Sequence, residues 1–174
     1  VNTRYIWSRS GSVGADDDPM SFSQSNPQGI EVNQGNVGYP DVSSYGYSPN
    51  AVVDVVYVKN SLPYFSQSTD SGGSYSQATV IGQQYCGYSL RCIAVDSPSP
   101  DYSYRISVVW TTGTEIYFIK HDGNNWENEE RWTDNEVTDD FVDVSLAYNS
   151  GVSEYYSHVV WQESQQDVWY ARDP

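Results

Sequence analysis

The chain of 174 residues is poor in basic residues, and this shortage excludes whole classes of partner. Eight Lys and Arg residues stand against 23 Asp and Glu residues, so the formal net charge is −15. A surface this acidic repels phosphate groups, which argues against nucleic-acid binding and against attachment to an anionic membrane surface. We therefore expect neither a nucleic-acid partner nor a membrane partner. Solubility, or tolerance of high salt, is the simplest explanation of the charge.

Long apolar runs and helical patterns are also missing. No stretch approaches the roughly 20 apolar residues that a membrane-spanning helix needs, and no leader segment is recognisable. No window places apolar side chains at helical spacing between suitable capping residues. The sequence predicts a soluble, mature or excised segment without membrane insertion and with few or no helices.

Histidine and metal-binding motifs are scarce. The only histidines are His121 and His158, and no zinc motif, nucleophile elbow or phosphate-binding glycine loop occurs. Oxygen ligands gather in two runs, Asp16–Asp18 and Asp139–Asp140, but neither run has the spacing of a known calcium loop. We expect no cofactor, with Ca²⁺ at these runs as the alternative.

The two cysteines lie six residues apart in "CGYSLRC", with a glycine between them. In an acidic, tyrosine-rich chain that has few other metal ligands, Cys86 and Cys92 are interpreted as a local disulfide that closes a turn. This disulfide implies an oxidising compartment, and we expect the chain to be extracellular or at a cell surface.

Tyrosine and strand patterns dominate what remains. The chain has 16 Tyr and 6 Trp residues, and period-two alternation is common. Three stretches share a valine pair followed by an aromatic residue and are spaced 53 and 51 residues apart: 53–57, 106–110 and 157–161. Each is followed by a second aromatic strand (62–68, 115–121, 167–173) and preceded by an apolar strand with a turn (41–51, 92–104, 143–156). A partial copy occupies 4–7 and 20–29.

A four-stranded unit that repeats near fifty residues, without helices between the units, is typical of a β-propeller. The alternative is a β-sandwich whose hairpins resemble one another. We predict a single all-β domain of about 3.5 to 4 blades. The blades fall roughly at 1–37, 38–86, 90–138 and 139–174.

The stretch "STDSGGSY" gives this repeat a family resemblance. Ser68, Asp70, Gly72 and Tyr75 fit the pattern S-x-D-x-G-x-x-aromatic after the third strand of a blade. This pattern resembles the Asp-box of the sialidase-like (BNR repeat) β-propeller proteins. In that family the Asp caps the turn, the Gly adopts positive φ and the aromatic residue packs under the hairpin. A shortened version, "HDGNNW", contains Asp122, Gly123 and Trp126.

Three and a half blades leave the ring incomplete, because the family's enzymes have six. The alternatives are a ring shared by two copies, a ring completed by another chain, and a compact four-bladed ring in which the first and last segments merge into one blade. A fragment of a longer protein is a further alternative. Self-association or a second chain is therefore an expected partner.

The resemblance also implies a test for catalysis. The family's enzymes clamp a carboxylate with three arginines and use a Tyr–Glu pair and an Asp. The six arginines here are not placed in the matching motif, and no catalytic residue is carried over. Glu127 and Glu130 in "NNWENEERW" form a possible carboxylate pair, for which solvated charge on a connecting loop is the simpler explanation.

Binding is expected at three equivalent loops between the first and second strands of each unit. Each loop brings two tyrosines: Tyr45 and Tyr47, Tyr102 and Tyr104, Tyr155 and Tyr156. Exposed aromatic rings of this kind stack on sugars or on peptide. The sequence predicts a non-catalytic extracellular module for recognition or surface assembly that binds glycan or protein. The alternatives are a sialidase-type glycoside hydrolase completed by another chain, and a structural subunit of a surface layer or filament.

Overall fold

The computed structural model describes residues 5–8, 28–31, 37–46, 51–87, 89–95, 105–152 and 154–173. Every regular element in these residues is a β-strand, so the prediction of an all-β chain is confirmed. The strands are β1 (Tyr5–Ser8), β2 (Gln28–Glu31), β3 (Val37–Tyr45), β4 (Val52–Lys59), β5 (Leu62–Ser68), β6 (Thr79–Val80), β7 (Ser89–Val95), β8 (Arg105–Thr111), β9 (Ile116–His121), β10 (Glu130–Arg131), β11 (Asp139–Asn149), β12 (Glu154–Glu163) and β13 (Asp167–Asp173).

Consecutive strands form consecutive antiparallel sheets. β3 to β6 make one four-stranded sheet, β7 to β10 make a second, β11 to β13 make a three-stranded sheet, and β1 pairs with β2. Within each of the three larger sheets, every strand pairs with its neighbour in sequence, so each of these sheets is an antiparallel meander. The β4–β5 turn consists of Asn60 and Ser61, both at positive φ, which is the mirror-image geometry that suits a two-residue hairpin.

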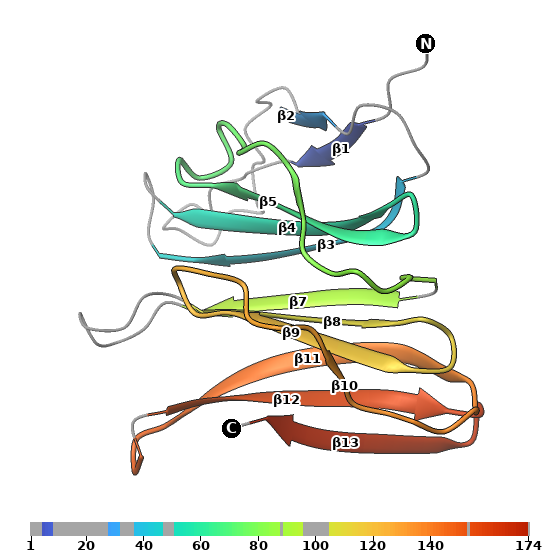
Figure 1. The fold of residues 1–174 in the computed structure, drawn as a ribbon. Helices are drawn as coiled ribbons and strands as arrows, with labels where there is room; N and C mark the ends of the chain where they lie inside the picture. The colour runs from blue at the N-terminus through green and yellow to red at the C-terminus, as the bar shows by residue number, and fades with distance from the viewer. Residues whose placement is uncertain are drawn as a thin grey trace, which may run out of the picture.

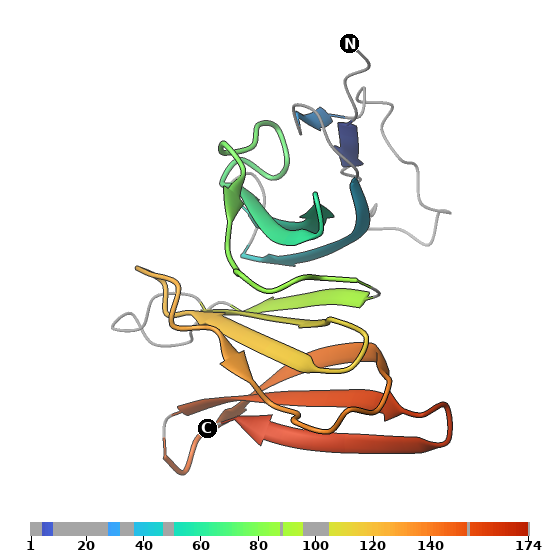
Figure 2. The same ribbon diagram turned by 45° about the vertical axis from the view of Figure 1, so that its right-hand side comes forward.

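The sheets stack face to face (Figures 1 and 2). The first strands of the three larger sheets lie next to one another, because β7 contacts both β3 and β11. The β1–β2 pair and β13 lie at opposite ends of the stack (Figure 1). Among the described strands no sheet closes on itself, and the propeller arrangement stays a prediction.

Two hydrophobic cores hold the stack together, and each is built from two neighbouring sheets. The first core combines Val56, Val58 and Phe65 of the β3–β6 sheet with residues of the β7–β10 sheet, among them the fully buried Trp110. The second combines residues of the β7–β10 and β11–β13 sheets: Val109, Ile116, Phe118, Val142, Val144, Val159 and Trp161. Adjacent valines point to opposite faces of a strand, and both members of each pair are buried: Val55 and Val56 in β4, Val108 and Val109 in β8. Both strands are therefore covered on both sides.

The valine-pair strands occupy equivalent positions in the three sheets. They are the second strands β4, β8 and β12, and their pairing with the third strand follows one register: Val56 lies opposite Phe65, Val109 opposite Phe118, and Val160 opposite Tyr170. The two-residue strands β6 and β10 pair with equivalent residues of β5 and β9. Among the described residues, no strand pairs with the free edge of β13.

Candidate binding surface

The strand ends that carry the predicted tyrosine loops lie on one side of the stack. β3, β7 and β11 all end on the left in Figure 1, where β4, β8 and β12 begin. Of the six predicted tyrosines, Tyr47, Tyr102 and Tyr104 lie outside the described residues. The half-buried Tyr45 packs against the first core. Tyr155 and Tyr156 begin β12, next to the β11–β12 turn.

The β11–β12 hairpin end gathers aromatic rings and a cation. The Tyr148 and Tyr155 rings lie 5.0 Å apart between centroids, tilted by 48°. The Arg172 guanidinium lies 4.7 Å from the Tyr156 ring centroid, a cation–π distance. Tyr148 is 44% exposed and Arg172 is also exposed. We call Tyr148, Tyr155, Tyr156 and Arg172 the hairpin end; the register puts Tyr148 and Tyr155 on the face of the sheet toward the other sheets, and Tyr156 and Arg172 on the opposite face.

A second surface covers the side of the β11–β13 sheet that faces away from the other sheets. We call this surface the outer face; it consists of Asp143 and Ser145 on β11, His158 and Val160 on β12, and Val168, Tyr170 and Arg172 on β13. His158 Nδ1 lies 2.8 Å from the Tyr170 hydroxyl, and the two rings stack at 5.9 Å. His158 therefore orients an exposed tyrosine. On this face the neighbours of His158 are Ser145 and Arg172 across the strands, with the apolar Val160 two residues along β12.

The first Asp-box turn is held by side-chain hydrogen bonds. Asp70 Oδ1 accepts from the Ser74 N–H (2.8 Å) and from Ser68 Oγ (2.7 Å), while Ser68 Oγ accepts from the Gly72 N–H (2.8 Å). These bonds, first those from Ser68 and then those from Ser74, lower the pKa of Asp70 to about 2. Gly72 has φ of 87°, and Tyr75 packs beside Val55 and Tyr57. In this geometry the motif residues stabilise the turn.

In the shorter turn after β9, an Asp carboxylate again accepts hydrogen bonds from backbone N–H groups, but without the serine hydroxyls of the first turn. Asp122 Oδ1 accepts from the N–H groups of Asn124 (2.7 Å) and Asn125 (2.8 Å), and Gly123 has φ of 98°. His121 Nδ1 accepts from the Gly123 N–H (3.0 Å). Burial lowers the pKa of His121 and outweighs the opposite effect of Asp122. Trp126 packs edge-on against Phe65 of the neighbouring sheet, with centroids 5.2 Å apart.

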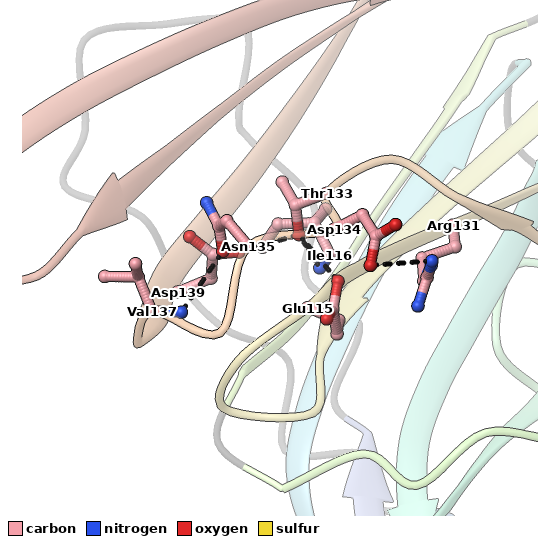
Figure 3. A network of polar contacts seen from close by, with 8 residues as sticks. All are labelled: Glu115, Ile116, Arg131, Thr133, Asp134, Asn135, Val137 and Asp139. Atoms are coloured by element: carbon pink, nitrogen blue, oxygen red, sulfur yellow. Dashed lines mark hydrogen bonds and ion pairs between the residues drawn. The ribbon is translucent and has the colours of Figure 1, made fainter.

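The connection from β10 to β11 contains a network of carboxylates (Figure 3). Thr133 lies at its centre: its Oγ1 accepts from the Ile116 N–H (2.8 Å), donates to Asp139 Oδ2 (2.7 Å) and lies 3.3 Å from Glu115 Oε2. Asn135 donates to Glu163, which also accepts from Trp169 Nε1 (2.9 Å). Arg131 forms an ion pair with Asp134 at 2.8 Å.

Asp139 is the buried member of this network, with no exposed surface and with Oδ1 lacking a hydrogen-bond partner. Burial raises the pKa of Asp139; the Thr133 hydrogen bond opposes this, and Glu163 and Glu115 add to it. A carboxyl without exposed surface cannot reach a substrate as the structure stands. Among the described residues, no group of three or more His, Cys, Asp or Glu side chains is arranged to hold a metal ion. The run Asp16–Asp18 lies outside the described residues.

The two carboxylates that the sequence analysis proposed as a pair, Glu127 and Glu130, each contact a side chain of this chain. Glu127 lies 3.8 Å from Lys120 Nζ, and Glu130 accepts from Trp132 Nε1 at 3.1 Å. Sequence reasoning missed Glu129, whose Oε2 accepts from the Gln83 N–H at 2.7 Å and so ties the segment before β7 to the residues before β10. Nothing in the local sequence indicates this contact, because the two residues are 46 positions apart.

Cys86 lies in the first core and is 2% exposed. Burial raises the pKa of its thiol to about 12, so the thiolate is not formed at neutral pH. The side chain of Cys92 lies outside the described part of the chain. The disulfide between the two residues therefore stays a prediction.

Two further exposed aromatic residues were not predicted. Tyr39 and Phe141 lie at register shifts in β3 and β11, at φ of 49° and 48°, and are 46% and 67% exposed. Positive φ in a bulky residue costs about 1–2 kcal/mol and is concentrated at functional positions. The repeated segments "GYPDV" and "DFVDV" are the sequence signal that marks them.

Comparison with protein-family models and with curated proteins finds no match for this chain. In the part of the chain that the structure describes, no helix has the length and apolarity needed to cross a membrane.

Proposed function

We propose that this chain is a non-catalytic extracellular module for recognition or surface assembly, which binds glycan or protein at the side of the stack where β3, β7 and β11 end. The observation that carries the proposal is the hairpin end. It offers an exposed Tyr148 ring tilted against Tyr155 on one face of the sheet, and an exposed guanidinium over the Tyr156 ring on the other face. Aromatic surfaces of this kind stack on sugar rings and on peptides.

In this proposal the sheets are blades of a sialidase-like propeller of about 3.5 to 4 blades. Support comes from the succession of meanders and from the first strands β3, β7 and β11, which lie side by side. The Asp-box residues then stabilise turns and take no part in binding. Their hydrogen bonds support this assignment, because Asp70 and Ser68 bond within their own turn.

The buried position of Asp139 supports a non-catalytic role for the carboxylate network. General acid catalysis by a carboxyl requires hydrogen-bond reach to the substrate. Asp139 has no exposed surface, and its Oδ2 is occupied by Thr133. The network instead joins the β9, β11 and β12 ends through Glu115, Asp139 and Glu163.

A glycan array and a library of displayed peptides test the proposal. Wild-type chain should bind a restricted set of glycans or peptides. Tyr148→Ala and Tyr155→Ala should each weaken this binding about fivefold or more, since stacking on one ring contributes about 1 kcal/mol or more. Tyr85→Ala is the matched control, because Tyr85 is 53% exposed and lies in the segment between β6 and β7.

Three outcomes would contradict this proposal. Binding that is lost equally in the Tyr85→Ala control would remove the hairpin end as the site. An absence of any bound ligand would favour the structural subunit. Turnover of a fluorogenic sialoside that Arg105→Ala abolishes would establish the glycoside hydrolase.

A further inference from the structure

The outer face of the β11–β13 sheet carries apolar or aromatic residues at the positions that are buried in the other two sheets. In the β3–β6 sheet the equivalent positions on β4 and β5 are Val56 and Phe65, exposed by 0% and 8%. In the β7–β10 sheet they are Val109 and Phe118, exposed by 0% and 1%. Both pairs are covered by the next sheet in the stack.

In the last sheet the same two positions are open. Val160 is 39% exposed and Tyr170 is 58% exposed. Val168, at the position that the fully buried Ile116 occupies in the preceding sheet, is 79% exposed. Three apolar side chains that the register places together therefore lie uncovered, and exposed apolar clusters of this kind mark interaction surfaces.

We propose that the outer face binds the same face of a second copy of this chain. The two strands that flank β12 place opposite charges on this face: Arg172 on β13 and Asp143 on β11. A two-fold axis that runs along β12 lays β13 of one copy over β11 of the other. This arrangement lays Arg172 over Ser145 of the second copy, two residues along β11 from Asp143, and leaves Val160 near the axis, where its own counterpart meets it.

The contact continues the packing that already holds the stack together. Each internal interface in the chain is a sheet-on-sheet contact centred on a valine of the second strand and an aromatic residue of the third. A second copy supplies an apolar sheet face of the same spacing. The inference goes beyond the proposed function, because it assigns a partner to the apolar residues of the outer face; of the residues named on this face, Arg172 also belongs to the hairpin end.

The net charge opposes this association and makes it depend on salt concentration. Each chain has a formal charge of −15, so two copies repel one another at low ionic strength. Salt screens this repulsion, with a Debye length that falls from about 30 Å at 0.01 M to about 10 Å at 0.1 M. Apolar burial is not weakened by screening. Association through the outer face should therefore become stronger as NaCl is raised.

Sedimentation velocity of the whole chain tests the proposal over a range of protein concentration and NaCl. Wild type should shift from monomer to dimer as either is increased. Val168→Lys should weaken dimerisation about tenfold or more. Val152→Lys is the matched control, because Val152 is 54% exposed in the β11–β12 turn and should leave dimerisation unchanged. Circular dichroism checks that both variants are folded.

A charge exchange tests the orientation of the two copies. At an NaCl concentration that screens the net charge, Arg172→Asp and Asp143→Arg should each weaken the dimer, and the double variant, whose net charge is unchanged, should recover most of the loss. A wild type that stays monomeric under every condition overturns the proposal, as does equal weakening by Val168→Lys and Val152→Lys. Glycan binding by a strictly monomeric chain would retain the proposed function and reject this inference alone.

Discussion

At the scale of single residues, Gly72 tests whether the Asp-box turn depends on backbone geometry. Its φ of 87° lies where a side chain is disfavoured, while the nearest atom to an added Cβ, the Tyr75 hydroxyl oxygen, is at an ordinary 3.5 Å. Gly72→Ala should therefore lower the free energy of unfolding by about 1 kcal/mol for backbone reasons alone. Urea denaturation measures the change. Gly38→Ala is the control, since an added Cβ there has no neighbour within 4 Å and no positive φ. Equal effects at both glycines would contradict the assigned geometry.

Asp54 gives a pH dependence with a definite sign. The side chain is fully buried, Gln67 donates to its Oδ1 (2.9 Å), and burial raises its pKa from 3.8 to about 6. The folded state then holds a proton that the unfolded state has released between these values. The free energy of unfolding should fall by about 3 kcal/mol in all as the pH rises from below 4 to above 6, with about 2 kcal/mol of this fall between pH 4 and pH 6.

Asp54→Asn removes the titrating group and keeps the oxygen that accepts from Gln67. Chemical denaturation at several pH values should show a smaller decrease from pH 4 to pH 6 in Asp54→Asn than in wild type. The lowered pKa of His121 has the opposite effect on the free energy of unfolding. The stability that comes from keeping His121 neutral is lost as the pH falls below about 6.5, because the unfolded state then takes up a proton more readily than the folded state. Parallel pH curves for wild type and Asp54→Asn would show that Asp54 is ionised in the folded protein.

At the scale of elements, Val109 and Val160 occupy the same position in the second strands of their sheets, so the same substitution can be compared at the two sites. Val109 is fully buried between two sheets, and Val160 is 39% exposed on the outer face. Val109→Asp buries an unpaired carboxylate and should destabilise the fold by more than about 3 kcal/mol. Val160→Asp should cost less than about 1 kcal/mol in the monomer. Thermal unfolding at low protein concentration compares the two, and similar losses would mean that the outer face is covered within the monomer.

Some elements were predictable because their pattern is local. The valine pair followed by an aromatic residue predicted β4, β8 and β12, since strands buried on both faces have continuous apolar runs. The strands β6 and β10 have only two residues each and no pattern of their own; their positions follow from pairing with β5 and β9. The bulges near Tyr39 and Phe141 depend on the register with β4 and β12, which the sequence of one strand does not contain.

The contacts at the candidate sites likewise fall into those that a local motif predicts and those that depend on residues far apart in the sequence. The turn chemistry of Asp70 and Gly72 is encoded within eight residues, so its hydrogen bonds follow from the motif. The partner of Tyr156 is Arg172, and the partner of Thr133 is Asp139; the first contact comes from strand pairing and the second from the docking of a connection. The outer face was not predictable, because Val160 and Val109 lie in nearly identical sequence and differ only in what covers them.

At the scale of the whole molecule, the acidic charge should make stability depend on salt. Self-repulsion of a net charge of −15 destabilises the compact state and is screened by added ions. The midpoint of thermal unfolding should rise by several degrees between about 0.01 M and 0.1 M NaCl at neutral pH. Differential scanning fluorimetry at low protein concentration measures the monomer. A midpoint that falls with salt would mean that attractive ion pairs, such as Lys120 with Asp173, outweigh the repulsion.

The uncovered outer face is the central claim, and hydrogen–deuterium exchange read by mass spectrometry locates it most directly. Peptides that cover 157–173 should exchange more slowly as the protein concentration is raised in 0.5 M NaCl, while peptides that cover 52–68 keep one rate. Val168→Lys should abolish the concentration dependence. Exchange of 157–173 that is independent of concentration, or protection that appears in another sheet, would contradict the assignment of this face as the contact between two copies.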